Sequence, residues 1–285
     1  MSRTLDRGRV GLYVVLLAMV AFYLAPLEAG LVTAFKTEVG FLETTPYAPP
    51  PAGEFTVEAW RTAFGRLQQG LVNSALMAVP ATVLSALFGS LAAYGLTNLN
   101  WRGQVGVLVL FVAGVFLPYQ SVLVPLTQFW STVDLAGRLP LAVVADYEGL
   151  IQLGITHAAY GIPICTVLFR AYYATLDEEM LEAARLDGAS AMTVYRRIVL
   201  PLSVPIFAVT LIYQFTNIWN DLLFALVLVN DPSNQVVTVA LNQLQGSFVN
   251  QYNLQMAGAF IAALPTLVVY VLFGEQFAKG VAGET

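Results

Sequence analysis

The most obvious feature of this sequence is a series of long apolar segments separated by polar ones. Each is at least as long as the roughly 20 residues that a helix needs to cross a hydrocarbon core of about 30 Å. Lipid cannot hydrogen-bond the backbone, so each segment is predicted to be helical, and the alternation of a membrane β-barrel is absent. The pattern predicts an all-α membrane protein with six transmembrane helices, at residues 10–35, 71–96, 105–129, 150–173, 201–229 and 254–273.

Composition supports a membrane protein and excludes several other classes. The 285 residues are 58% hydrophobic and 11% charged, and only Glu28, Arg170 and Asp221 bring charge into the six segments. A soluble enzyme or a disordered chain would carry far more charge. The net charge of −5 argues against a nucleic-acid partner. Cys165, the single cysteine, excludes an internal disulfide and is expected to be a small buried residue.

Positive charge is unevenly distributed between the polar segments. Of the 13 Lys and Arg residues, eight lie before the first segment, after the last one or in every second connection, and Arg170 lies at the adjoining end of a segment. The other connections hold four. This asymmetry predicts a cytoplasmic N-terminal tail at residues 1–9, a permease domain at 10–274 and a cytoplasmic tail at 275–285. The alternative, a secretory signal peptide, is disfavoured because the first run is long and no clean cleavage site follows it.

Two features of the first outer connection can be predicted. Residues 46–51 contain four prolines and are expected to be extended. Residues 56–67 could form a short helix on the outer surface. No internal repeat is visible, which weakens an inverted-repeat secondary transporter.

The inner connection at residues 174–200 holds eight charges. Asp177 is a good N-cap, followed by Glu178 and Glu179 where carboxylates favour the positive end of the helix dipole. Gly188 is expected to end this helix, and Ser190 to cap a second one. The second helix has an apolar face made of Ala191, Val194, Tyr195, Ile198, Val199 and Leu202.

Such a segment is either a solvated connector or a docking element. A plain connector between two spans can be only a few residues long. Here small residues stand beside fixed charges, so another protein surface could approach closely and pair with them. We therefore expect residues 174–200 to bind a cytoplasmic partner.

The same segment resembles the EAA motif of ABC importer permeases. Glu182-Ala183-Ala184, Gly188 six positions after the glutamate, and Ile198-Val199-Leu200-Pro201 match that motif. Asn73-Ser74, Ala92-Ala93-Tyr94 and Trp219-Asn220-Asp221 are similar to the carbohydrate permeases, the subfamily of the six-span maltose-type inner-membrane subunit. Asp177 stands where the family usually has Ile-Pro, but it is a competent cap.

The resemblance implies a coupling helix that sits in a cleft of a cytoplasmic ATPase subunit. It further implies a second permease subunit, as a heterodimer or homodimer, two ATPase subunits and an external solute-binding protein. The candidate docking residues are Asp177, Glu178, Glu179, Glu182, Ala183, Ala184, Arg185, Asp187, Gly188 and Ala189.

No P-loop sequence occurs, so ATP and Mg are expected to be used by the partner ATPase, and the chain is expected not to be an enzyme. One histidine, one cysteine and scattered carboxylates do not suggest a metal site. His157 is most simply a core or pathway residue, because no acid lies near it in sequence to support a proton relay. Glu28 is expected to be interfacial.

Polar side chains at membrane depth are candidates for a translocation pathway. They follow a helical spacing in the fifth segment, although polar side chains also hold helices together. The candidates are Thr210, Gln214, Asn217, Asn220 and Asp221, with Tyr213 on a neighbouring arc.

The last outer connection, residues 230–253, resembles the family loop that reaches into the binding protein, or it is a plain polar loop. It contains Asn242, Gln243, Gln245, Gly246, Ser247 and Asn250. The sequence as a whole predicts the permease subunit of an ATP-driven sugar importer. The alternatives are an importer of peptides, polyamines or another small solute, and an ion-coupled secondary transporter using Asp221 and His157.

Overall fold

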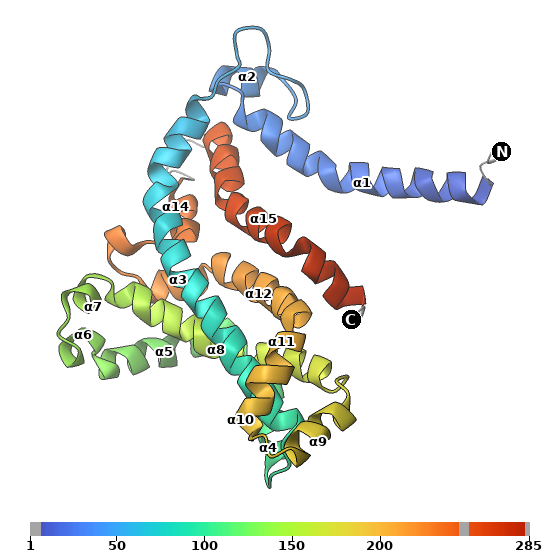
Figure 1. Ribbon diagram of the computed structural model, residues 1–285. Helices are drawn as coiled ribbons and strands as arrows, with labels where there is room; N and C mark the ends of the chain where they lie inside the picture. Colours follow the sequence, from blue (N-terminus) through green and yellow to red (C-terminus); the bar gives the residue numbers. More distant parts are fainter. Residues whose placement is uncertain (1–6, 245–250, 283–285) are drawn as a thin grey trace. The chain divides into compact units, whose positions relative to one another are not determined.

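The computed structural model describes residues 7–244 and 251–282, and these residues are almost entirely helical (Figure 1). Within them the only β-type pairing is an isolated bridge between Lys36 and Phe55. The chain divides into two compact units, one of residues 1–68 and 240–263 and one of residues 69–239 and 264–285.

The first unit holds α1 (Arg7–Ala34), α2 (Glu38–Glu43), the start of α3 (Glu58–Thr97), the end of α14 (Val237–Gln243) and the first half of α15 (Tyr252–Ala282). Gly30 lets α1 approach the side chains of Met256 and Phe260 on α15. The most apolar window of α1 is nevertheless 0% buried. That helix therefore has an apolar surface for lipid or another chain to cover.

The connection after α1 is held by a buried lysine. Lys36 Nζ donates to the Thr45 carbonyl at 2.8 Å, and the Lys36 carbonyl accepts from Asn253 Nδ2 at 3.0 Å. Burial lowers the pKa of Lys36, and the Glu28 carboxylate partly opposes this shift. Residues 46–51 are non-helical, as predicted, but they are not extended throughout, because a turn begins the stretch and the Ala48 N–H donates to the Thr45 carbonyl at 3.1 Å. The prediction of a separate helix at residues 56–67 is wrong, because α3 runs without a break from Glu58 to Thr97.

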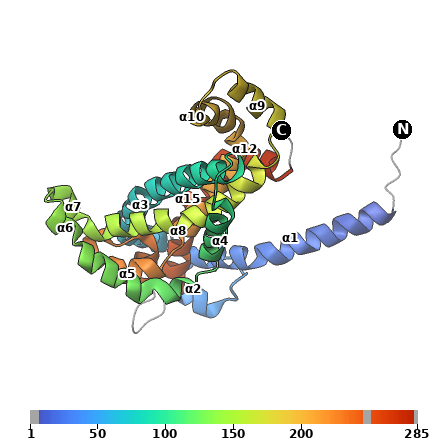
Figure 2. The same ribbon diagram turned by 90° about the horizontal axis from the view of Figure 1, so that it is seen from below.

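The second unit is built around α8 (Glu148–Tyr173), which packs against α4 (Gln104–Val115) and α12 (Val204–Trp219) (Figure 2). The rest of α3 contributes a row of buried small residues to this unit, and Ser85 Oγ donates to the Ala158 carbonyl of α8 at 3.0 Å. The shorter elements are α5 (Tyr119–Val133), α6 (Leu135–Arg138), α7 (Ala142–Asp146), α9 (Glu178–Leu186), α10 (Ala191–Val194), the π-turn η1 (Tyr195–Val199), α11 (Leu200–Leu202), α13 (Leu223–Leu228) and the 3-10 turn η2 (Pro232–Asn234).

Two segments predicted as single helices are broken. The helix expected at 105–129 divides into α4 and α5, which meet at 103°. Pro118 at the break has no N–H, and it restricts the residue before it to extended conformations. The helix expected at 201–229 is interrupted at Ser203 and again between α12 and α13, with a bend of 77° at the first break.

In the described part of the chain, four helices are long and apolar enough to cross a membrane, or up to six if each bent pair counts as one span. The chain is therefore a multi-pass membrane protein by helix length and composition. The count of six spans stays a prediction.

Candidate functional site

Helix α9 is formed by the local signals that its sequence carries. The Asp177 side chain accepts from the Glu179 N–H at 3.0 Å, and the helix ends at Leu186. Gly188 then has a φ of +84°, a left-handed conformation that other residues adopt at a cost. Ser190 accepts from the Thr193 N–H at 3.2 Å and caps α10. Both predicted caps and the predicted glycine turn are confirmed.

One side of α9 is anchored and the other is open. Leu181 is buried in a cluster with residues of α3, α8 and η1, and Ala184 packs against that cluster. The remaining predicted docking residues of the helix and its turn are exposed, apart from the half-buried Ala189: Asp177, Glu178, Glu179, Glu182, Ala183, Arg185, Asp187 and Gly188. Leu186 is 88% exposed. This protruding apolar side chain is not among the predicted docking residues, although its position beside Asp187 is a signal that the sequence contains.

Arg185 has a partner within its own chain. Its guanidinium Nη2 donates to the Asn98 carbonyl at 2.6 Å, at the C-terminal end of α3. Tyr94, one turn earlier on α3, donates its hydroxyl to the Ala191 carbonyl at 3.0 Å. Both bonds tie the charged segment to α3, so α9 and α10 are held against the end of a long helix.

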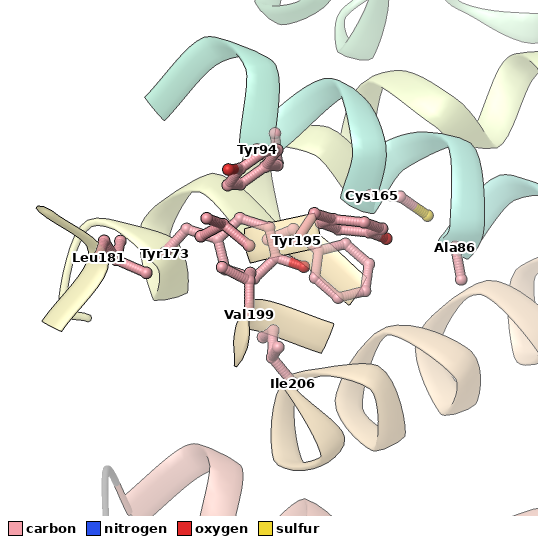
Figure 3. Close-up of a cluster of buried hydrophobic side chains, with 11 residues drawn as sticks. Ala86, Tyr94, Cys165, Tyr173, Leu181, Tyr195, Val199 and Ile206 are labelled. Carbon is pink, nitrogen blue, oxygen red and sulfur yellow. The ribbon is translucent and has the colours of Figure 1, made fainter. Parts of the chain in front are cut away.

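A buried hydroxyl network lies beneath α9. Ser90 Oγ is 2.6 Å from Tyr173 Oη and 2.8 Å from Tyr195 Oη, and Ser203 Oγ is 3.3 Å from Tyr173 Oη. The network joins α3, α8, the π-turn η1 and the break before α12. Figure 3 shows Tyr94, Tyr173 and Tyr195 gathered among apolar side chains of these elements. The sequence indicated Tyr195 only as part of an apolar face.

The polar face predicted for α12 is divided between core and surface. Thr210 and Gln214 are buried, and the Thr210 hydroxyl donates to the Ile206 carbonyl at 2.8 Å. Asn217 and Asn220 are exposed, and each side-chain amide donates to the carbonyl four residues earlier. The face is therefore not one continuous polar stripe.

Asp221 has a structural role at the start of α13. Its Oδ2 accepts from the N–H groups of Phe224 at 3.1 Å and Ala225 at 3.4 Å, while its carbonyl accepts from Thr238. His157 Nε2 lies 3.3 Å from the same oxygen. The ion-coupled alternative named both residues, but their contact was not predicted, because 64 positions separate them and only the packing of α8 against the end of α12 brings them together.

Within residues 7–244 and 251–282, no group of three or more His, Cys, Asp or Glu side chains could hold a metal ion. Cys165 is fully buried, as expected. Of the predicted outer-loop residues, Asn242 and Gln243 belong to α14, whereas residues 245–250 lie outside the described part of the chain.

Comparison with known proteins gives consistent matches. A family model described as the inner membrane component of binding-protein-dependent transport systems matches residues 85–281, more than half of the chain. The xylose/arabinose import permease protein XacI of Haloferax volcanii is 47% identical over 97% of this chain and 93% of its own length. A probable ABC transporter permease protein of Pyrococcus horikoshii is 41% identical over 98% of this chain and 97% of its own length.

Solved structures show the same fold. One chain of a bacterial ABC transporter involved in the import of the acidic polysaccharide alginate matches with a TM-score of 0.73 and 18% identity, over 97% of this chain and 99% of that one. The predicted permease fold is thereby confirmed. The family match extends over α9, the buried network beneath it and the polar helix α12. This chain belongs to the family of inner membrane components of binding-protein-dependent transport systems.

Proposed function

We propose that this chain is one membrane-spanning subunit of an ATP-driven importer that takes up a sugar delivered by an external binding protein. Its family consists of inner membrane components of binding-protein-dependent systems. The relative that shares 47% of its residues is named for xylose and arabinose import. The proposed partners are a second permease subunit, two ATPase subunits that use ATP and Mg, and the binding protein.

The observation that carries this proposal is the construction of α9. Its buried side rests on a rigid cluster, while Glu182, Asp187 and Leu186 point away from the chain's own core. An 88% exposed leucine beside carboxylates is what a docking helix presents to a partner pocket, because burying such a side chain stabilises a complex by about 1.5–3 kcal/mol. A solvated connector would need neither the anchor nor the protruding leucine.

The proposal includes an orientation. The excess of Lys and Arg in the terminal tails and around residues 174–200 supports a cytoplasmic location for both termini and for α9. The connections around α2 and η2 then face the outside, where a binding protein would dock.

The pathway is proposed to run along the exposed part of α12. Asn217 and Asn220 are the exposed members of the predicted polar set, whereas Thr210, Gln214 and Asp221 lie inside the unit. Exposed amides at membrane depth are poorly suited to lipid contact.

The contact between His157 and Asp221 does not argue for an ion-coupled transporter. Asp221 Oδ2 already accepts two backbone N–H groups at the start of α13. These bonds explain a buried carboxylate without a proton pathway.

The docking role can be tested on the importer purified with its ATPase. Leu186→Asp places a charge where an apolar contact is proposed, so the amount of ATPase that co-purifies should fall about 10–100-fold. Leu42→Asp in α2 is the matched control, because Leu42 is 81% exposed and is proposed to lie on the opposite side of the membrane.

Retention of the ATPase by the Leu186→Asp variant at the level of the Leu42→Asp variant would show that α9 is not the docking element. Uptake of D-xylose or L-arabinose by the wild-type importer in liposomes, dependent on ATP, tests the sugar. Import of oligopeptides or polyamines instead would replace the proposed substrate class.

A further inference from the structure

A small polar pocket lies in the second unit, away from α9. It has a volume of about 80 Å³, which is room for only a few water molecules. The break between α4 and α5 forms one side of it, and α8 and α12 form the others. The polar side chains that line it are Tyr119, His157, Tyr160, Tyr213, Gln214 and Asn217.

Several of these polar groups have no hydrogen-bond partner in the part of the chain that the structure describes. The side-chain amide of Gln214 is 4% exposed and makes no hydrogen bond, and the Tyr119 and Tyr213 hydroxyls make none. His157 is 2% exposed, and its Nε2 lies 3.3 Å from Asp221 without a hydrogen bond. Buried polar groups in folded proteins are almost always paired, so the buried Gln214 amide in particular calls for a partner. The half-buried Tyr119 hydroxyl and the exposed Tyr213 hydroxyl are free to bind a molecule in the pocket.

A glycine makes the buried amide possible. A Cβ at position 161 would overlap both the Gln214 amide nitrogen and Ser85 Oγ. Gly161 on α8 therefore leaves the space in which the Gln214 side chain lies against α8 at the edge of the pocket. The amide is fixed by packing, although no donor or acceptor of the described chain satisfies it.

Aromatic rings give the pocket a firm wall. The Tyr119 ring stacks on Phe224 with centroids 4.7 Å apart and meets the Tyr160 ring edge-on at 4.8 Å. The Tyr160 hydroxyl donates to the Leu117 carbonyl at the α4–α5 break. The Tyr119 hydroxyl is thus held in a fixed direction while remaining unpaired.

The lining selects against anions. It contains no Lys or Arg, and Asp221 adds a carboxylate beside His157. At the rim, Tyr213 is 44% exposed and Asn217 is exposed, so the pocket meets the surface of α12. Amides, phenol hydroxyls and an aromatic wall suit a neutral molecule that carries hydroxyl groups and C–H faces.

We propose that this pocket binds one hydroxyl-bearing edge of a neutral sugar as the sugar crosses the membrane, so that this subunit contacts the substrate directly. The inference rests on the proposed function and adds a substrate subsite to it. Gln214 and Tyr119 supply the inner hydrogen bonds, and Tyr213 with Asn217 supplies those at the rim.

The test uses the complete importer in liposomes, with D-xylose and its monodeoxy analogues as probes. Tyr119→Phe, Tyr213→Phe and Gln214→Leu each remove hydrogen-bonding groups and little volume. The KM of sugar-dependent uptake should rise about 2–10-fold for each group lost. Tyr270→Phe is the matched control, because Tyr270 is also 44% exposed and lies on α15, and its uptake should be unchanged.

The deoxy analogues give the sharper measurement. The wild-type importer should discriminate against the analogue that lacks the bound hydroxyl, and the variant that lost its partner group should discriminate about 2–10-fold less. The same binding protein serves every variant, so its own preference cancels. A loss of packing would slow all sugars equally.

Three results would overturn the inference, and they can be told apart. Unchanged KM and unchanged discrimination in all three variants would show that the pocket is not a sugar subsite, and would leave the proposed function of the chain standing. Loss of co-purification with the second permease would assign these side chains to subunit packing. A wild-type importer that takes up neither D-xylose nor any other neutral sugar would overturn the proposed substrate class, and the pocket assignment with it.

Discussion

At the scale of single residues, Asp221 has a capping role that its prediction as a pathway residue did not include. The spacing of polar side chains placed it on one helical face with Asn217, because residues 201–229 were predicted as one helix. In the structure the helix ends at Trp219, and the Asp221 carboxylate accepts from the first N–H groups of α13. Aspartate is a strong N-cap residue, so this sequence signal was present. Only the assumption of an unbroken helix concealed it.

A second aspartate makes a prediction about pH. Asp231 Oδ1 accepts from the Ser233 N–H and hydroxyl, both at 2.8 Å, and these bonds lower the pKa of Asp231 from its usual 3.8. A carboxyl whose pKa is depressed on folding stabilises the folded turn above pH 3.8 and loses that contribution as pH falls through the folded value. Hydrogen-exchange protection of the Ser233 amide, relative to its intrinsic rate, should therefore decline in that acid range.

The matched variant is Asp231→Asn, which keeps the shape and loses the ionisation. Its Ser233 protection should be lower than that of the wild type near pH 6 and should not change as the pH is lowered. An equal acid-induced decline in both proteins would mean that another group controls the turn.

At the scale of elements, the success of prediction depended on whether local residues determine the conformation. Helix α9 follows from its own caps and glycine, and the structure has each of them in place. The breaks at residues 116–118 and 203 could not be predicted in this way. Pro80, Pro163 and Pro265 lie inside continuous helices, so a proline in an apolar run does not by itself indicate a break. The surrounding packing decides which proline bends the chain.

The buried hydroxyl network predicts an energetic coupling between elements. Ser90 lies within 2.8 Å of the hydroxyls of both Tyr173 and Tyr195. Ser90→Ala and Tyr195→Phe should each lower the free energy of unfolding by about 1 kcal/mol. Because they remove the same bond, the double variant should lose less than the sum of the two, by about 0.5 kcal/mol or more. Unfolding of the purified protein in mixed micelles gives these values.

The control is Tyr172→Phe, which removes the hydroxyl that donates to the Leu202 carbonyl at 2.7 Å outside the network. Its effect should add to that of Ser90→Ala. Additive losses for Ser90→Ala with Tyr195→Phe as well would show that the hydroxyls do not act together, and the π-turn would then be held by its apolar contacts alone.

At the scale of the whole molecule, composition predicted the environment better than the arrangement. Exposed leucine, valine and phenylalanine side chains cover the described helices, and the most apolar window of α1 is 0% buried. Such surfaces are stable only against lipid or another chain. The length of the apolar segments in the sequence shows directly that lipid or another chain must cover them. It carries no information on which helices meet, and for that reason the pairing of His157 with Asp221 could not be predicted.

The last prediction concerns how the molecule lies in the membrane. Cys165 is fully buried, so Cys165→Ala should provide a background free of reactive thiols for single-cysteine variants. The charge asymmetry predicts that α9 lies inside the cell and η2 outside. A membrane-impermeant maleimide should therefore label Glu182→Cys only in inside-out vesicles and Ser233→Cys only in intact cells, since both positions are exposed. Labelling of both variants from the same side would mean that the chain crosses the membrane an even number of times between residues 182 and 233. The bent helix pair α11 and α12 would then be a re-entrant loop instead of a span.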